Sequence, residues 1–154
     1  MMFNIGGIQF PVLVPYGKPA IEIYVSGCNR TECFKNCQNP ELQDFNYGKK
    51  LDITKLIAHL KEREKLFQVI SITGGDLLCQ NNESAFKLIL RLKVAFSTHG
   101  FYLFTGEGKL EDIPKWCFIM FDTIKYGNYQ EDLKQDGFPA SSNQKLWYKN
   151  PLDK

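Results

Sequence analysis

Three cysteines stand close together in a polar stretch of the chain, at Cys28, Cys33 and Cys37. Three thiolates on one short loop can bind separate corners of an iron–sulfur cluster without help from distant segments. Such clusters usually take four cysteines, so a loop with three leaves one iron open to another ligand. The chain has five cysteines, and in a reducing compartment this clustering favours metal ligation over disulfides. The pattern therefore predicts an exposed metal site.

A zinc site is the alternative interpretation of the same three cysteines, because zinc takes four Cys or His ligands. The residues that could complete it are His59, His99, Cys79 and Cys117. Both histidines fall at positions more typical of a helix surface or boundary than of a ligand. The two remaining cysteines are more typical of small buried hydrophobic residues, although Cys79 lies near the proposed site.

Composition indicates one soluble globular domain over residues 1–154. Hydrophobic residues make up 44% and charged residues 23%, and the net charge is +2. This mild charge gives no reason to expect binding to nucleic acid or a membrane surface. The N-terminal residues do not resemble a signal peptide, and no apolar run approaches the roughly 18–20 residues of a membrane span. We therefore expect a cytoplasmic protein.

The apolar pattern predicts strands that alternate with helices. The expected strands are 9–14 (an edge strand), 20–26, 68–73, 101–105 and 118–124, and the expected helices are 53–60 (capped by Asp52), 82–97 and 110–116. The last thirty residues are rich in turns. Such alternation favours βαβ units with right-handed crossovers. We expect an α/β fold: a single-domain open or partial (βα) barrel with a mostly parallel sheet.

Residues 26–48, SGCNRTECFKNCQNPELQDFNYG, resemble the cluster loop of radical S-adenosylmethionine (SAM) enzymes. The resemblance is strongest to the activating enzymes of anaerobic, glycyl-radical ribonucleotide reductases. That family reads Gly-Cys, three residues, Cys, two residues, Cys, His-Asn-Pro-Glu, then an aromatic residue and Gly. Here Gln-Asn-Pro-Glu follows Cys37, and each gap between cysteines is one residue longer.

Four further segments resemble motifs of that family, in the same order along the chain. Gly74-Gly75-Asp76 stands where the family has Gly-Gly-Glu-Pro, a motif that hydrogen-bonds the amino group of the methionine moiety. The resemblance implies these SAM-binding residues: Gly74, Gly75, Asp76, Thr105, Asp122, Ser142 and Asn143. For Asp122, an ion pair with Lys125 is the structural alternative.

The resemblance implies a fold of the radical SAM type and a specific activity. Cys28, Cys33 and Cys37 would bind a 4Fe–4S cluster, with SAM on the fourth iron. One electron from a flavodoxin or ferredoxin would release a 5′-deoxyadenosyl radical, which takes hydrogen from a glycine of the large subunit of an anaerobic ribonucleotide reductase. The alternatives are a radical SAM enzyme with another substrate, and a non-enzymatic metal-binding or regulatory protein on a decayed version of the fold.

Overall fold

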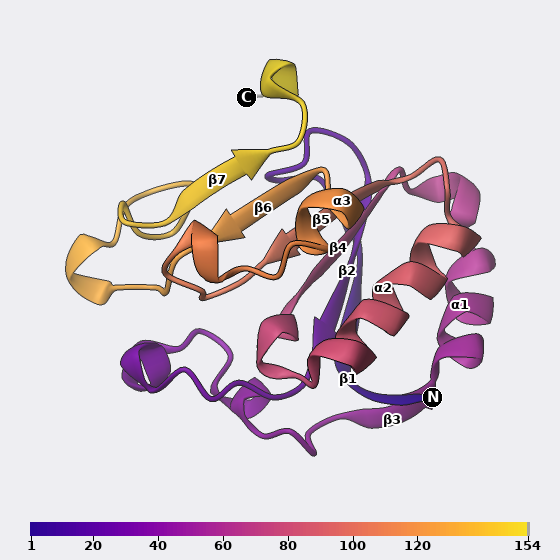
Figure 1. The fold of residues 1–154 in the computed structure, drawn as a ribbon, viewed down its shortest axis with the longest axis horizontal. Coiled ribbons are helices and arrows are strands. Elements are labelled where there is room, and N and C mark those ends of the chain that lie inside the picture. The colour runs from indigo at the N-terminus through magenta and orange to yellow at the C-terminus, as the bar shows by residue number, and fades with distance from the viewer. Residues whose placement is uncertain (154) are drawn as a thin grey trace.

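The computed structural model describes residues 1–153, which form a seven-stranded sheet with helices packed on it (Figure 1). The strand order is β3-β1-β2-β4-β5-β6-β7. The strands are β1 (Met2–Val12), β2 (Ala20–Val25), β3 (Lys49–Asp52), β4 (Val69–Gly74), β5 (Gly100–Phe104), β6 (Thr123–Tyr126) and β7 (Lys145–Tyr148). The α-helices are α1 (Ile53–Lys61), α2 (Asn82–Ala95) and α3 (Cys117–Met120).

Four neighbouring strands, β2, β4, β5 and β6, run parallel at the centre of the sheet. Their carboxyl ends therefore meet at one edge. Open parallel sheets bind their ligands at this edge, because the loops that leave the strands converge there. The cysteine loop leaves β2 at this edge, and the Gly74-Gly75 turn leaves β4 beside it.

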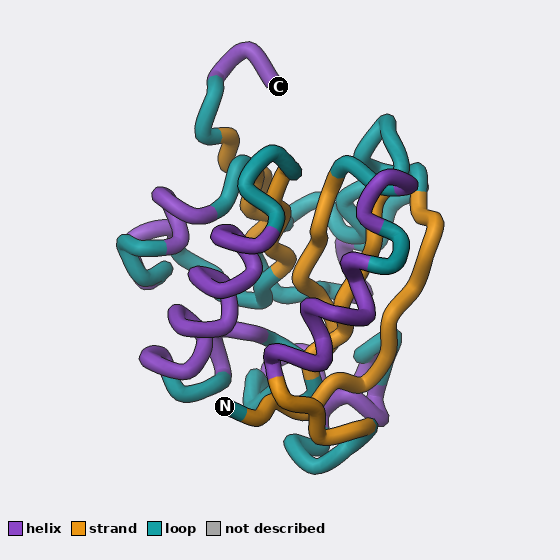
Figure 2. The backbone as a smooth tube through the Cα atoms, turned by 90° about the vertical axis from the view of Figure 1, so that its right-hand side faces the viewer, coloured by secondary structure: helices purple, strands orange, loops and turns teal. Residues whose placement is uncertain are grey.

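One face of the sheet carries the main hydrophobic core. Strand residues such as Ile23, Ile72 and Leu103 are fully buried there against apolar side chains of α1, α2 and α3. Both long helices begin at a capped residue: the Asp52 carboxylate accepts from the Thr54 amide and the Asn81 side chain from the Ser84 amide. In Figures 1 and 2 the two helices run side by side over this face.

The other face of the sheet is more polar and faces the candidate site. Glu22 is buried there, and its carboxylate accepts hydrogen bonds from the Tyr16 hydroxyl at 2.6 Å and the Tyr24 hydroxyl at 2.9 Å. The Tyr16 hydroxyl also lies 2.8 Å from Ser71. These bonds satisfy polar groups that would be costly to bury alone.

The expected (βα) barrel of the radical SAM type is wrong. The sheet is mixed, since β1 pairs antiparallel with both β2 and β3, and β6 pairs antiparallel with β7. It is also open, because β3 and β7 lie at opposite ends of the strand order. The reason is that β1 and β2 join through a short connection, which an antiparallel pair permits and a parallel pair does not.

Several element predictions are confirmed, with small shifts at their ends. The strands β2, β4 and β5 and the helices α1 and α2 lie where the apolar pattern placed them. The predicted strand at 118–124 is wrong in its first half, since residues 117–120 form α3 and β6 begins at Thr123. A short apolar run cannot by itself distinguish a buried helix from a buried strand.

Within residues 1–153, no helix has the length and apolar character needed to cross a membrane.

Candidate cluster-binding site

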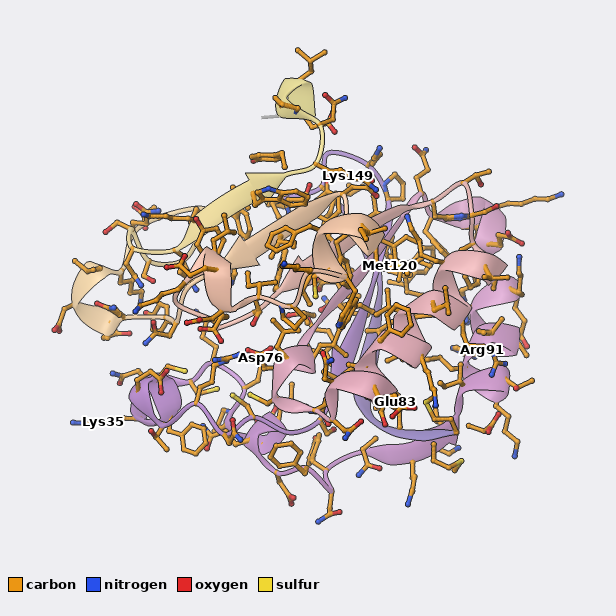
Figure 3. All side chains as sticks on the ribbon, in the orientation of Figure 1. Lys35, Asp76, Glu83, Arg91, Met120 and Lys149 are labelled. Carbon is orange, nitrogen blue, oxygen red and sulfur yellow. The ribbon has the colours of Figure 1, made fainter. Side chains whose placement is uncertain are left out.

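The three predicted cysteine ligands lie on one loop at the carboxyl edge of the parallel strands. Cys28 follows β2 after two residues, Cys33 lies in the 3₁₀ turn Thr31–Asn36, and Cys37 ends that turn. All three thiols are free and half-buried, and all three line one cavity of about 330 Å³. Lys35, on the same turn, points away from the rest of the molecule (Figure 3).

The root of this loop is fixed by backbone contacts that require glycine. The Gly27 amide donates to the Leu42 carbonyl at 2.8 Å, and the Cys28 amide to the Gln43 carbonyl at 3.2 Å. Gly27 has a φ of +107°, and a Cβ added to it would lie 2.2 Å from the Phe45 ring. The aromatic residue that closes the loop therefore packs directly on the backbone before Cys28.

The Gly74-Gly75 turn holds the end of β4 against the same root. The Gly75 amide donates to the Val25 carbonyl at 2.8 Å, and the Asp76 amide to the Gly27 carbonyl at 2.9 Å. A Cβ on Gly75 would lie 2.5 Å from the Gly27 oxygen. Both glycines also line the cavity. Their backbone thus holds the two loops together at the wall of the cavity.

Asp76 is almost fully buried and is the centre of the site's hydrogen bonding. Its carboxylate accepts from the Thr105 hydroxyl at 2.9 Å and from the amides of Gly106 and Leu78 at 2.8 and 2.9 Å. It also accepts from the Arg30 guanidinium, Nε to Oδ2, at 2.6 Å. These donors use the lone pairs of both oxygens.

Arg30 joins the cysteine loop to the sheet edge. It lies between Cys28 and Cys33, and its second contact is to the Glu107 carboxylate at 3.2 Å. The guanidinium is mostly buried by the turn after β5. Arg30 and Glu107 were not among the predicted site residues. The signal that could have found Arg30 is a cation between two ligand cysteines, close to the expected position of Asp76.

The sheet face forms the opposite wall of the cavity and carries the positive charge of Lys125. The Lys125 ammonium lies 4.9 Å from the centre of the Phe104 ring and 5.9 Å from that of Phe138. In the described chain, residues 1–153, no Asp or Glu forms an ion pair with it. Burial lowers the pKa of Lys125 to about 8. An anionic group bound in the cavity would stabilise the Lys125 ammonium and raise this pKa again.

A tyrosine on the same wall is held by the buried carboxylate. Burial, followed by the charge of Glu22, raises the pKa of Tyr24 to about 12, so the phenol stays protonated near neutral pH. Both Glu22 and Tyr24 line the cavity. They were not predicted as site residues, since their alternation in β2 indicated only an amphipathic strand.

The seven residues that the family resemblance assigned to SAM do not all meet at the cavity. Gly74, Gly75, Asp76 and Thr105 do. Asp122 lies before β6, at the amino edge of the parallel strands, and its carboxylate accepts from the Phe101 amide at 2.8 Å. That edge is opposite to the cysteine loop. The expected ion pair with Lys125 is likewise absent from the described chain.

Ser142 and Asn143 flank the cavity without lining it, and their neighbour Gln144 does line it. Ser142 is exposed, and its amide donates to the Leu133 carbonyl. The Asn143 side-chain amide donates to the Asn128 carbonyl at 2.8 Å, while its Oδ1 is buried without a partner.

The zinc interpretation finds no support in the geometry. No group of three His, Cys, Asp or Glu side chains among residues 1–153 converges closely enough to hold a single ion. His99 packs against Phe67 and Phe96, and His59 is exposed on α1. A single zinc ion needs all its ligands at about 2.0–2.3 Å, whereas each thiolate of a cubane cluster binds a different iron.

The chemistry of the donor set fits an iron–sulfur cluster. Three free thiols with no disulfide face one cavity from a loop whose other side chains are largely exposed. A hydrogen bond from the Cys79 thiol lowers the pKa of Cys28, while burial raises the pKa of Cys33. Metal binding deprotonates thiols of this kind.

Fold and site together define a small mixed α/β domain with a cysteine-lined cavity at its parallel edge. Comparison with known families matches residues 17–147 to the family described as a 4Fe-4S single cluster domain. The match spans most of the chain, so this protein belongs to that family. A comparison with curated proteins finds no match.

Proposed function

We propose that this protein binds a 4Fe–4S cluster through Cys28, Cys33 and Cys37 and cleaves SAM reductively. When bound and reduced, such a cluster supplies one electron to the sulfonium of SAM, which yields methionine and a 5′-deoxyadenosyl radical. The proposed substrate of that radical is a glycine Cα–H on the large subunit of an anaerobic ribonucleotide reductase. A flavodoxin or ferredoxin is the proposed electron donor.

The observation that carries the proposal is the shared cavity. The three thiols and the Gly74-Gly75 turn line the same space of about 330 Å³, which is within the range of small-molecule sites. Lys125 supplies a positive charge for a carboxylate-bearing ligand, and the rings of Phe104 and Phe138 supply apolar surface. Arg30 and Asp76 hold the loop against the sheet edge.

The proposal is tested by anaerobic reconstitution with iron and sulfide, followed by SAM and dithionite. We expect about four irons per chain and the release of 5′-deoxyadenosine and methionine. A Cys33→Ala variant should lose both, whereas Cys117→Ala, which removes a cysteine outside the loop, should keep them. A wild-type protein that binds the cluster but releases no 5′-deoxyadenosine would contradict SAM cleavage.

The protein substrate needs a separate test, because SAM cleavage alone does not identify it. Reconstituted protein is incubated with SAM, a reductant and the large subunit of an anaerobic ribonucleotide reductase. The expected result is a glycyl-radical signal in electron paramagnetic resonance, with a Gly→Ala variant of the reductase as the control. SAM cleavage without that signal would favour another substrate.

A non-enzymatic cluster protein is the second candidate, and one observation favours it. The Asp76 carboxylate already accepts from Arg30, Thr105, Gly106 and Leu78, so it has no free lone pair for the amino group of SAM. Under this candidate Asp76 acts only in holding the loops together. Cluster formation with no binding of SAM in an equilibrium assay would support it over the enzyme.

A further inference from the structure

A second cavity, of about 180 Å³, adjoins the cluster cavity on the polar face of the sheet. The two cavities share a wall made by Phe104 and Phe138. The strand registers place Tyr102, Thr123 and Tyr148 directly opposite one another on β5, β6 and β7, so their side chains form one row on this face. Typical ligand sites have volumes of about 300–1,000 Å³. The second cavity therefore fits a single chemical group better than a whole cofactor.

Aromatic rings make up most of the wall of the second cavity. The Tyr16 ring lies edge-on to Tyr102, with 5.1 Å between ring centres, and nearly parallel to Phe104 at 6.1 Å. The Phe104 and Phe138 rings are 5.5 Å apart. The rings that line the cavity are Tyr16, Tyr102, Phe104, Phe138 and Tyr148. Because the faces of such rings carry partial negative charge, a group of them attracts cations.

The charges around the second cavity are also negative. Among residues 1–153, no Lys, Arg or His lines it, whereas Asp153 does and forms no ion pair with another described residue. The Tyr16 hydroxyl donates to the buried Glu22 carboxylate at 2.6 Å, which places a second negative charge behind the Tyr16 ring. Lys125 lines only the cluster cavity, on the other side of the shared wall. The second cavity is therefore suited to a positively charged group.

We infer that the second cavity binds a positively charged side chain, a guanidinium or an ammonium, of the protein substrate. The inference rests on the proposed function, since the shared wall places this side chain next to the glycine that would enter the cluster cavity. A guanidinium can stack on the tyrosine rings and pair with the Asp153 carboxylate, and an ammonium can lie over the ring faces. The cavity thereby selects substrates that carry a cation near the reactive glycine.

The first test is a nuclear magnetic resonance titration of the full chain with N-acetyl-arginine amide, N-acetyl-lysine amide and the neutral isostere N-acetyl-citrulline amide. We expect the two cationic probes to shift the amides of Tyr102, Thr123 and Tyr148 and to bind at least about fivefold more tightly than citrulline. Asp153→Asn should weaken arginine binding about threefold, whereas Asp136→Asn, at an exposed site outside the cavity, should leave it unchanged.

The second test asks whether the cation belongs to the protein substrate. Tyr148→Leu should raise, about fivefold, the concentration of reductase subunit needed for half-maximal formation of the glycyl radical. Tyr148→Phe keeps the ring and should behave as wild type does. A Tyr148→Leu protein with wild-type dependence on the reductase would overturn the assignment to the protein substrate.

Equal binding of arginine and citrulline amides, or shifts of neither at the three amides, would overturn the inference while the proposed function stands. This comparison of probes needs no variant, so it decides the matter even if Tyr148→Leu does not fold. It also needs no cluster, because no cysteine lines the second cavity. A wild type that binds arginine amide but forms no glycyl radical would contradict the proposed function, and with it the origin of the side chain.

Discussion

At the scale of single residues, the site depends on a buried ion pair between Asp76 and Arg30. Asp76 is 1% exposed, and its partner Arg30 brings the middle of the cysteine loop to the sheet edge. Removing one member of a buried pair is costly because the other charge is left uncompensated. The acid that the sequence placed in the site is therefore there, but its contacts are with the protein.

Asp76→Asn should destabilise the cluster-free protein by about 3 kcal/mol, because it leaves the Arg30 charge without its closest partner. The more exposed partner, Glu107, provides the control: Glu107→Gln should cost below about 1 kcal/mol. Urea unfolding followed by circular dichroism measures both. Equal effects of the two substitutions would show that Asp76 is not the anchor of the loop.

Lys125 is predicted to make stability depend on pH. Its folded pKa of about 8 lies below the usual 10.5, so below pH 8 the fold bears the full cost of a buried ammonium. As pH rises from 8 to 10.5 the folded protein releases this proton before the unfolded chain does, and the cost disappears. Lys125→Met should therefore stabilise the protein by about 2 kcal/mol at pH 7, with the difference vanishing near pH 10.5.

The control for this prediction is Lys93→Met, which removes an ammonium that lies 4.7 Å from the centre of the Phe101 ring on the helix face. Urea unfolding of the three proteins between pH 7 and 10.5 gives the comparison. A Lys125→Met protein that tracks wild type at every pH would mean that the ammonium is solvated in the cavity.

At the scale of elements, the site depends on two loops that approach each other's backbone. Gly75→Ala places a methyl group where the carbonyl oxygens of Gly27 and Leu42 lie 2.5 and 2.7 Å away. The loops must separate, so we expect a loss of about 1–3 kcal/mol in stability and reduced iron binding after reconstitution. Gly108→Ala is the control, since a Cβ there meets nothing within 4 Å. Unchanged iron binding by Gly75→Ala would contradict the proposed role of this contact.

The apolar pattern of the sequence predicted the helices and strands that it defines locally. It missed the strands that form only by pairing with a distant segment. Parallel β4 and β5 were expected, and the family resemblance assigned Asp76 and Thr105, which meet at the carboxyl ends of these strands, to one ligand. Asp122 was misplaced because α3 takes the first half of the predicted strand. Strand β6 therefore begins only after Asp122, which leaves Asp122 at the amino edge of the parallel strands, opposite to the cysteine loop. The strands β3 and β7 were missed, because each is four residues long and exists only by pairing with a distant strand.

At the scale of the whole molecule, the hydrophobic core and the cluster site are separate. The core lies between the sheet and the helices, whereas the 3₁₀ turn that carries Cys33 buries none of its residues. Leu42 is the buried residue of the next turn, and it ties the loop root to β1 by packing where a Cβ on Gly6 would lie. The fold therefore does not need the cluster to bury its apolar surface, unlike small domains that fold around their metal.

Removal of the cluster by a chelator should accordingly loosen the cysteine loop and leave the sheet intact. Hydrogen exchange followed by mass spectrometry compares the reconstituted protein with the same protein after chelation. Amides of residues 28–39 should exchange faster without the cluster, because this loop buries little side chain and the amides of Cys33 and Cys37 donate over long distances of 3.4 Å. Amides of β2 and β4, whose side chains on the helix face are fully buried, should keep their protection. Loss of protection in these central strands would mean that the cluster holds the whole domain together, in which case the stability of every variant above would have to be measured with the cluster bound.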